Sequence, residues 1–233
     1  MISQARVLEA LATVHDPELD EPITSLGFVG SCVVGERGDV DVHLRLPTPQ
    51  CAPNFAYLMA SDAREAVRRL PGVREVGVVL DDHYTAAEIN AAVQGDAGFG
   101  GAFPGESSGD LEALRELFQR KALLARQGRV CALLLQEAAA DHETIVALRV
   151  RDLPDHPEVA RCLALRRELN LPCEPGAPAL IAGDGSPLSA SELALWLRRA
   201  RLVGLSLESN GGICRSLLRV RHGVPDPTEE VAT

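Results

Sequence analysis

The sequence of 233 residues has few aromatic residues and almost no lysine. Aromatic side chains make up 3% of the chain, and Lys121 is the only lysine among 23 basic residues. No apolar run approaches the roughly 18 residues that a transmembrane helix needs, and the first residues do not resemble a signal peptide. We therefore expect a soluble, cytoplasmic protein whose thiols stay reduced.

Several catalytic and metal-binding motifs are also missing. The six cysteines form no C-x-x-C pair, so a closed zinc or four-thiolate site within one chain is not indicated. The chain has no E-x-x-H, which argues against a carboxylate-bridged di-iron enzyme. It has no H-E-x-x-H and no G-x-x-x-x-G-K-[ST] either, so zinc-protease and nucleotide-driven chemistry have no support.

The net charge of −10 excludes general binding to nucleic acids or to anionic membranes, because phosphate binding needs a basic surface. The charge is unevenly distributed. Residues 1–95 hold 7 basic and 14 acidic groups, whereas residues 96–233 hold 16 basic and 19 acidic groups. The acidic first part is thus suited to a protein partner.

The first 94 residues predict a small α+β domain. Residues 7–14 show helical spacing with Ser3 as a cap, and residues 26–34 and 40–46 look like strands joined by a turn at 36–38. A helix over 54–70, a strand over 73–80 and a short helix from residue 85 complete the domain. The expected fold class is α+β, with a mainly helical domain following.

The remaining chain divides into a linker, a helical domain and a tail. Glycine, serine and proline gather in residues 95–110, which predicts a linker, and residues 225–233 predict a flexible tail. The domain over 111–224 should hold a loop at 172–187 with a short strand at 179–182. Its expected helices cover residues 111–127, 130–140, 157–169, 189–202 and 210–221.

Cys51 is the strongest candidate for chemistry. It lies in a loop containing Pro47, Pro49 and Pro53, just before the start of an expected helix. Unpaired N–H groups at a helix N-terminus favour a thiolate, the form that binds soft metals or exchanges disulfides. The alternative is a small residue buried in a turn.

Residues 5–90 resemble the PaaD/SufT-like iron–sulfur cluster assembly domain. The sequence departs from the family pattern at Pro47 and at Ala52, where threonine and proline are usual. The matching blocks, in order, are Val14-His15-Asp16-Pro17-Glu18-Leu19, Ile23-Thr24-Ser25-Leu26-Gly27-Phe28-Val29, Thr48-Pro49-Gln50-Cys51-Ala52-Pro53 and Leu70-Pro71-Gly72-Val73-Arg74-Glu75-Val76.

This resemblance implies that Cys51 contacts iron or a cluster, and that Asp16 and Glu18 order the facing loop or supply carboxylates. The alternative for Asp16 and Glu18 is a turn in which they only cap the chain. A single thiolate cannot hold a cluster alone, so two copies of the chain, or the chain and a client, would share it. The bound iron or cluster would be transient, and no nucleotide is expected.

Two further sets of residues are weaker candidates. Asp82, His83 and Glu88 could supply oxygen and imidazole ligands to iron(II), although a solvated loop before a helix is the alternative. Cys214 is a second thiol to test. Six arginines near the end could dock the acidic first domain or an acidic client, or simply form a solvated helix face. They are Arg198, Arg199, Arg201, Arg215, Arg219 and Arg221.

The second half resembles an extension found in a subset of these proteins that is associated with soluble di-iron monooxygenases of the propane-oxidising type. The residues that carry this likeness are Arg120-Lys121-Ala122, Arg126-Gln127, Asn54-Phe55-Ala56-Tyr57-Leu58-Met59, Asp82-His83 and Glu88-Ile89-Asn90.

The sequence leaves three alternative functions. The first is a metalloprotein maturation factor that delivers iron or a cluster through Cys51. The second is a chaperone or adaptor for a di-iron monooxygenase that holds no metal. The third is thiol exchange at Cys51, which lacks a resolving cysteine nearby in sequence.

Overall fold

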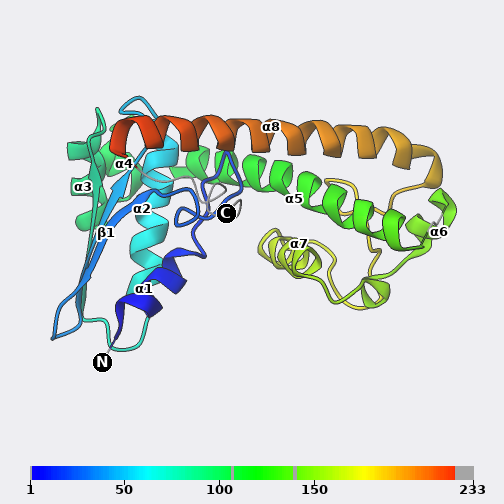
Figure 1. Ribbon diagram of the computed structural model, residues 1–233, viewed down its shortest axis with the longest axis horizontal. Helices are drawn as coiled ribbons and strands as arrows, with labels where there is room; N and C mark the ends of the chain where they lie inside the picture. Colours follow the sequence, from blue (N-terminus) through cyan, green and yellow to red (C-terminus); the bar gives the residue numbers. More distant parts are fainter. Residues whose placement is uncertain (1, 106–107, 139–140, 224–233) are drawn as a thin grey trace. The chain divides into compact units, whose positions relative to one another are not determined.

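The computed structural model describes residues 2–105, 108–138 and 141–223. The chain forms two compact units (Figure 1). The first unit contains Met1–Leu114 and Ser209–Thr233, and the second contains Arg115–Glu208. The α+β class predicted from the sequence is confirmed. None of the helices described is both long and apolar enough to span a membrane.

The first unit is built on a three-stranded sheet in the order β1-β2-β3. β1 (Val29–Val34) pairs antiparallel with β2 (Asp39–Arg45), and β2 pairs parallel with β3 (Glu75–Asp81). Along β2, Val40, Val42 and Leu44 are buried, as their alternation with polar residues predicts. The parallel pairing requires a crossover, and α2 provides it.

Helices cover this sheet (Figure 1). α2 (Pro53–Arg68) and α3 (Ala86–Gln94) pack against β3, and α1 (Gln4–Leu11) packs against α2. The cyan α2 presents alanines and other apolar residues to the core, among them Ala56, Ala60 and Ala63. The sheet and its helices thereby place the ends of β2 and β3 next to the start of α2, where Cys51 lies.

The expected linker over 95–110 is wrong in part. Residues Gly98–Ala102 form α4, and the Phe99 ring packs edge-on against Tyr57 at a centroid distance of 5.3 Å. Both Phe99 and Ala102 are buried in the core of the first unit. The glycine content of this segment hid two apolar residues whose burial is enough to order it.

The second unit contains the rest of α5 (Ser108–Ala138), α6 (His142–Ala147), a 3₁₀ turn at Val150–Asp152, α7 (Pro157–Glu168) and the first part of α8 (Ala190–His222). Its core surrounds Trp196. The strand expected at 179–182 is not formed. Ile181 makes only an isolated bridge to Pro187. The expected tail at 225–233 lies outside the residues described.

Two pairs of helices expected to be separate are continuous. Residues 111–127 and 130–140 belong to α5 as far as Ala138, and residues 189–202 and 210–221 belong to α8. Two glycines within these helices allow close packing. A Cβ at Gly128 would lie 2.8 Å from the Ala200 Cβ, and one at Gly211 would lie 2.7 Å from Glu21 Oε1. The predicted domain over 111–224 therefore differs from the observed units, because Ser209–His222 packs in the first unit.

The predicted turn at 36–38 is the hairpin between β1 and β2, and it depends on Gly38. Gly38 has φ +85°, and an added Cβ would collide with the Gly72 carbonyl oxygen. We expect Gly38→Ala to lower the free energy of unfolding by about 3 kcal/mol, from the left-handed backbone and the collision together. Gly35→Ala is the matched control, because its Cβ would meet Asp39 O at an ordinary 3.5 Å. Equal urea midpoints for the two variants would contradict this.

Candidate functional site

Cys51 lies in a tight loop between β2 and α2. The Gln50 N–H donates to Thr48 Oγ1 at 3.2 Å, and the Cys51 N–H points to Thr48 O at 3.5 Å. Pro53 is the first residue of α2, and the N-cap residue Ala52 makes no side-chain cap. The positive end of α2 therefore has no side-chain acceptor at its cap position, which favours an anion such as a thiolate nearby.

The Cys51 side chain is half-buried, and its Sγ lies 3.6 Å from Thr48 Oγ1. It packs against the apolar core of the first unit. A partly exposed thiol on a loop fixed at both ends can exchange ligands with an incoming partner without large backbone movement. The role of Cys51 as a ligand for iron or a cluster stays a prediction.

His83 approaches Cys51 through the backbone and not through the thiol. Its Nε2 donates to the Cys51 carbonyl oxygen at 2.8 Å, while Nδ1 accepts from the Thr85 N–H at 3.3 Å. The Tyr84 N–H also donates to Pro49 O at 3.2 Å. Both ring nitrogens are thus engaged, and the buried His83 positions the cysteine loop. The sequence groups His83 with Asp82 and Glu88, either as a ligand for iron(II) or as part of a solvated loop, and leaves its distance from Cys51 open.

The other two members of the expected oxygen and imidazole set do not join His83. Asp82 accepts a hydrogen bond from Arg221 of α8, and Arg221 also donates to the Asp82 carbonyl oxygen at 3.3 Å. Glu88 is exposed in the first turn of α3. Within the described ranges, no group of three or more histidine, cysteine, aspartate or glutamate side chains could hold a metal ion.

Asp16 orders its own loop. Its Oδ1 accepts the N–H groups of Glu18 and Leu19 at 2.8 and 2.9 Å, and its own N–H donates to Glu21 O at 2.9 Å. The side chain is buried, and burial raises the pKa of Asp16 to about 6, with smaller contributions from the charges of Glu18 and Glu21. The Asp16 carboxylate thus caps its own turn, which was the alternative to a role facing Cys51.

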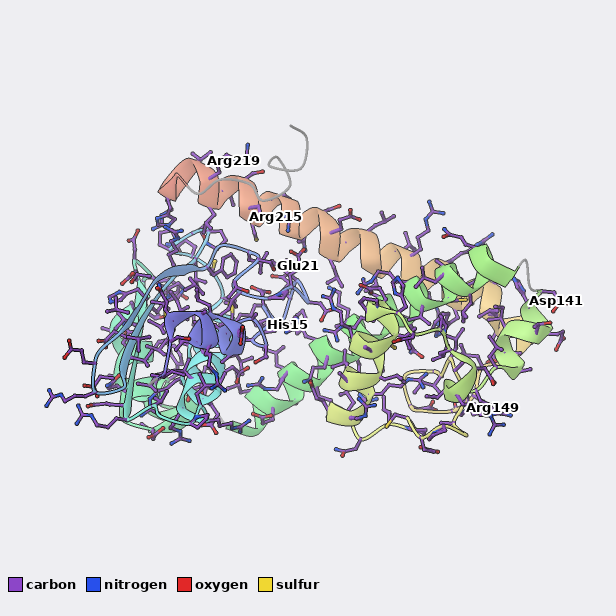
Figure 2. All side chains as sticks on the ribbon, turned by 60° about the horizontal axis from the view of Figure 1, so that its bottom comes forward. His15, Glu21, Asp141, Arg149, Arg215 and Arg219 are labelled. Carbon is purple, nitrogen blue, oxygen red and sulfur yellow. The ribbon has the colours of Figure 1, made fainter. Side chains whose placement is uncertain are left out.

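The end of α8 adds a second thiol to this site. Arg215 donates to Glu21 at 2.7 Å (Figure 2), and Leu218 is buried in the core of the first unit. Cys214 packs against that same core, as Cys51 does. Burial, with smaller contributions from the negative charges of Asp16, Cys51 and Glu18, raises the pKa of Cys214 to about 11. The Arg215–Glu21 pair places the turn of α8 that contains Cys214 beside the Asp16 loop, because the Glu21 carbonyl accepts the Asp16 N–H.

The six arginines separate into two groups. Arg198, Arg199 and Arg201 are exposed on the part of α8 in the second unit. Arg215 and Arg221 bind carboxylates of their own unit. Arg219, which follows Arg215 on α8 (Figure 2), is partly buried. For Arg215 and Arg221, the expected partner is therefore the acidic first part of the same chain, which was one of the alternatives. Because they are already paired within the chain, Arg215 and Arg221 are unsuited to binding another protein.

Residues 4–78 match a family model described as iron–sulfur cluster assembly protein. An uncharacterized protein of Methanocaldococcus jannaschii is 36% identical over 90 residues, which are 39% of this chain and 93% of that protein. An iron–sulfur cluster carrier protein of Deinococcus radiodurans is 38% identical over 89 residues, 38% of this chain and 23% of the carrier.

A carrier of the same name from Mycobacterium tuberculosis is 36% identical over 94 residues, 40% of this chain and 24% of the carrier. This chain therefore spans about a quarter of the length of the carriers that it matches.

Proposed function

Because this chain belongs to the iron–sulfur cluster assembly protein family, we propose that it is a maturation factor delivering iron or an iron–sulfur cluster to a client protein. The observation that carries the proposal is the position of Cys51. Its thiol lies before an uncapped helix start on a loop fixed by Thr48 and by the His83 hydrogen bond. A soft thiolate there is a suitable ligand for iron.

Delivery through Cys51 is a ligand exchange. The thiol loses its proton to water when iron binds, and on transfer a thiolate of the client bonds to that iron as the bond to the Cys51 Sγ breaks. No electron is transferred in this step. A site with few ligands favours release, and the described residues around Cys51 include no third metal ligand that would close the site.

The test is anaerobic reconstitution with ferrous iron and sulfide. We expect the wild-type protein to develop sulfur-to-iron absorption bands and to pass its cluster to an apo-ferredoxin. Cys51→Ala should lose at least about nine-tenths of the bound iron, because it removes the exposed ligand. Cys173→Ala is the control, since Cys173 is a partly exposed cysteine of the second unit. Full iron loading of Cys51→Ala, or a colourless wild-type protein, would contradict the proposal.

A second candidate is an adaptor for a client metalloprotein, for which the resemblance of the second half suggests a di-iron monooxygenase. The observation that favours it is an apolar face at the end of α8. Ile213, Leu217 and Val220 follow one another at helical spacing and are 58%, 41% and 87% exposed. The test is an activity assay of the client enzyme. If the Cys51→Ala protein activates that enzyme as well as the wild-type protein does, the result would favour the adaptor.

A further inference from the structure

We propose that Cys51 and Cys214 together form one two-thiol site, which holds a single iron of a [2Fe–2S] cluster during delivery. This inference rests on the proposed function and adds a second ligand to it. Cys214 belongs to α8, outside the residues 4–78 that match the assembly family. The second thiol is thus supplied by the part of the chain that this family model does not cover.

Two anchors fix Cys214 beside the cysteine loop. On one side, Arg215 pairs with Glu21, and Gly211 leaves room for the Glu21 carboxylate against the helix. The Glu21 carbonyl in turn accepts the Asp16 N–H. This anchor holds the turn of α8 that contains Cys214 against the Asp16 loop.

On the other side, Arg221 binds Asp82, and the neighbouring His83 donates to the Cys51 carbonyl. Cys214 directly precedes Arg215, and it lies on the face of α8 that also buries Leu218 four residues later. Both thiols pack against the core of the first unit, and the two anchors connect the segments that contain them, so we infer that they act on the same ligand.

The two thiols account for half of the coordination that a [2Fe–2S] cluster needs. Such a cluster takes four protein ligands, two on each iron. Cys51 and Cys214 would fill both positions on one iron and leave the outer iron for thiolates of the acceptor or of a second copy.

Neither loading nor delivery of the cluster needs an oxidant or a reductant. On loading, both thiols lose a proton to water, and two Fe–S bonds form to the same iron. On delivery, acceptor thiolates bond first to the outer iron and then to the inner one, and the bonds to Cys51 and Cys214 break. Each thiol then regains a proton from water.

The pair can be tested without a cluster. Phenylarsine oxide reacts with two adjacent thiols to form two As–S bonds and releases one water. The reduced wild-type protein should bind one equivalent that withstands excess monothiol, as measured by intact mass. Cys51→Ser and Cys214→Ser should each lose this adduct, and Cys173→Ser should keep it. An adduct on Cys214→Ser equal to that of wild type would overturn the pairing.

Cluster release then separates this inference from the proposed function. We expect Cys214→Ser to lose a reconstituted cluster to an iron chelator at least about tenfold faster than wild type, and Cys51→Ser to hold none. If Cys214→Ser releases its cluster at the wild-type rate while Cys51→Ser holds none, the two-thiol site is wrong and delivery through Cys51 stands. If both variants load normally, the two-thiol site and delivery through Cys51 are both wrong. Urea unfolding of each variant verifies that it is folded.

Discussion

Replacing Arg166 by methionine is expected to lower the free energy of unfolding of the second unit by about 4 kcal/mol. The Arg166 side chain on α7 is fully buried. Its guanidinium donates to the carbonyl oxygens of Pro172, Pro178 and Ala179 at 3.3, 3.0 and 2.7 Å, and to Gln127 Oε1 at 2.8 Å. Each buried acceptor left without a donor costs about 1–3 kcal/mol, and a domain has only about 5–15 kcal/mol in total.

The single tryptophan provides the measurement. Trp196 lies in the core of the second unit, so its fluorescence during urea unfolding reports on that unit. Arg167→Met is the matched control, because Arg167 is the next residue of α7 and is exposed. It should change stability by less than about 0.5 kcal/mol. A loss of less than 1 kcal/mol for Arg166→Met would show that the loop over 172–181 is held by other contacts.

Short-range patterns account for what the sequence predicted well. In β2, polar and apolar residues alternate, and both the hairpin turn and the end of α2 depend on nearby glycine and proline. The loop around Cys51 belongs to the same class, since Pro53 fixes the start of α2 two residues later. These features depend on residues a few positions apart, and a single sequence contains that information.

The features that were missed depend on contacts between distant residues. The continuity of α5 and α8 was missed, and nothing local shows that Gly128 and Gly211 each face a close neighbour. Cys51 and Cys214 are separated by most of the chain, and no spacing rule joins them. One available signal was charge. The arginines near Cys214 matched the acidic first part, and Arg215 and Arg221 do pair with Glu21 and Asp82.

The role of His83 is a further feature that the sequence alone does not show. The sequence did not show whether His83 approaches the cysteine loop, and the role of His83 depends on hydrogen bonds that only the folded loop reveals. Nε2 donates to the Cys51 carbonyl and Nδ1 accepts from Thr85, so the ring supports the loop and leaves no nitrogen for a metal.

Replacing Asp16 by asparagine is expected to stabilise the protein above pH 6, although Asp16 lies in the candidate site. Burial raises the pKa of Asp16 from 3.8 to about 6 in the folded state. Between these values the folded protein binds more protons than the unfolded chain, so the contribution of Asp16 to stability falls as the pH rises. The total loss is about 3 kcal/mol, at 1.36 kcal/mol per pKa unit.

Asparagine keeps the oxygen that accepts the N–H groups of Glu18 and Leu19, but it cannot ionise. The free energy of unfolding of Asp16→Asn minus that of wild type should therefore increase by about 2 kcal/mol from pH 4 to pH 7, because the unfolded chain is already partly ionised at pH 4. Urea unfolding followed by circular dichroism at several pH values measures this difference. Glu9→Gln makes the same charge change at an exposed position of α1 and is the control for net charge.

A difference that stays flat between pH 4 and 7 would show that Asp16 ionises as freely in the folded protein as in the unfolded chain. A rising difference would mean that the fold retains a destabilising carboxylate beside two thiols. Such a cost is expected where function requires the group. Asp16→Asn should also make Cys214 react faster with iodoacetamide at pH 8, because the Asp16 charge helps to raise the pKa of that thiol.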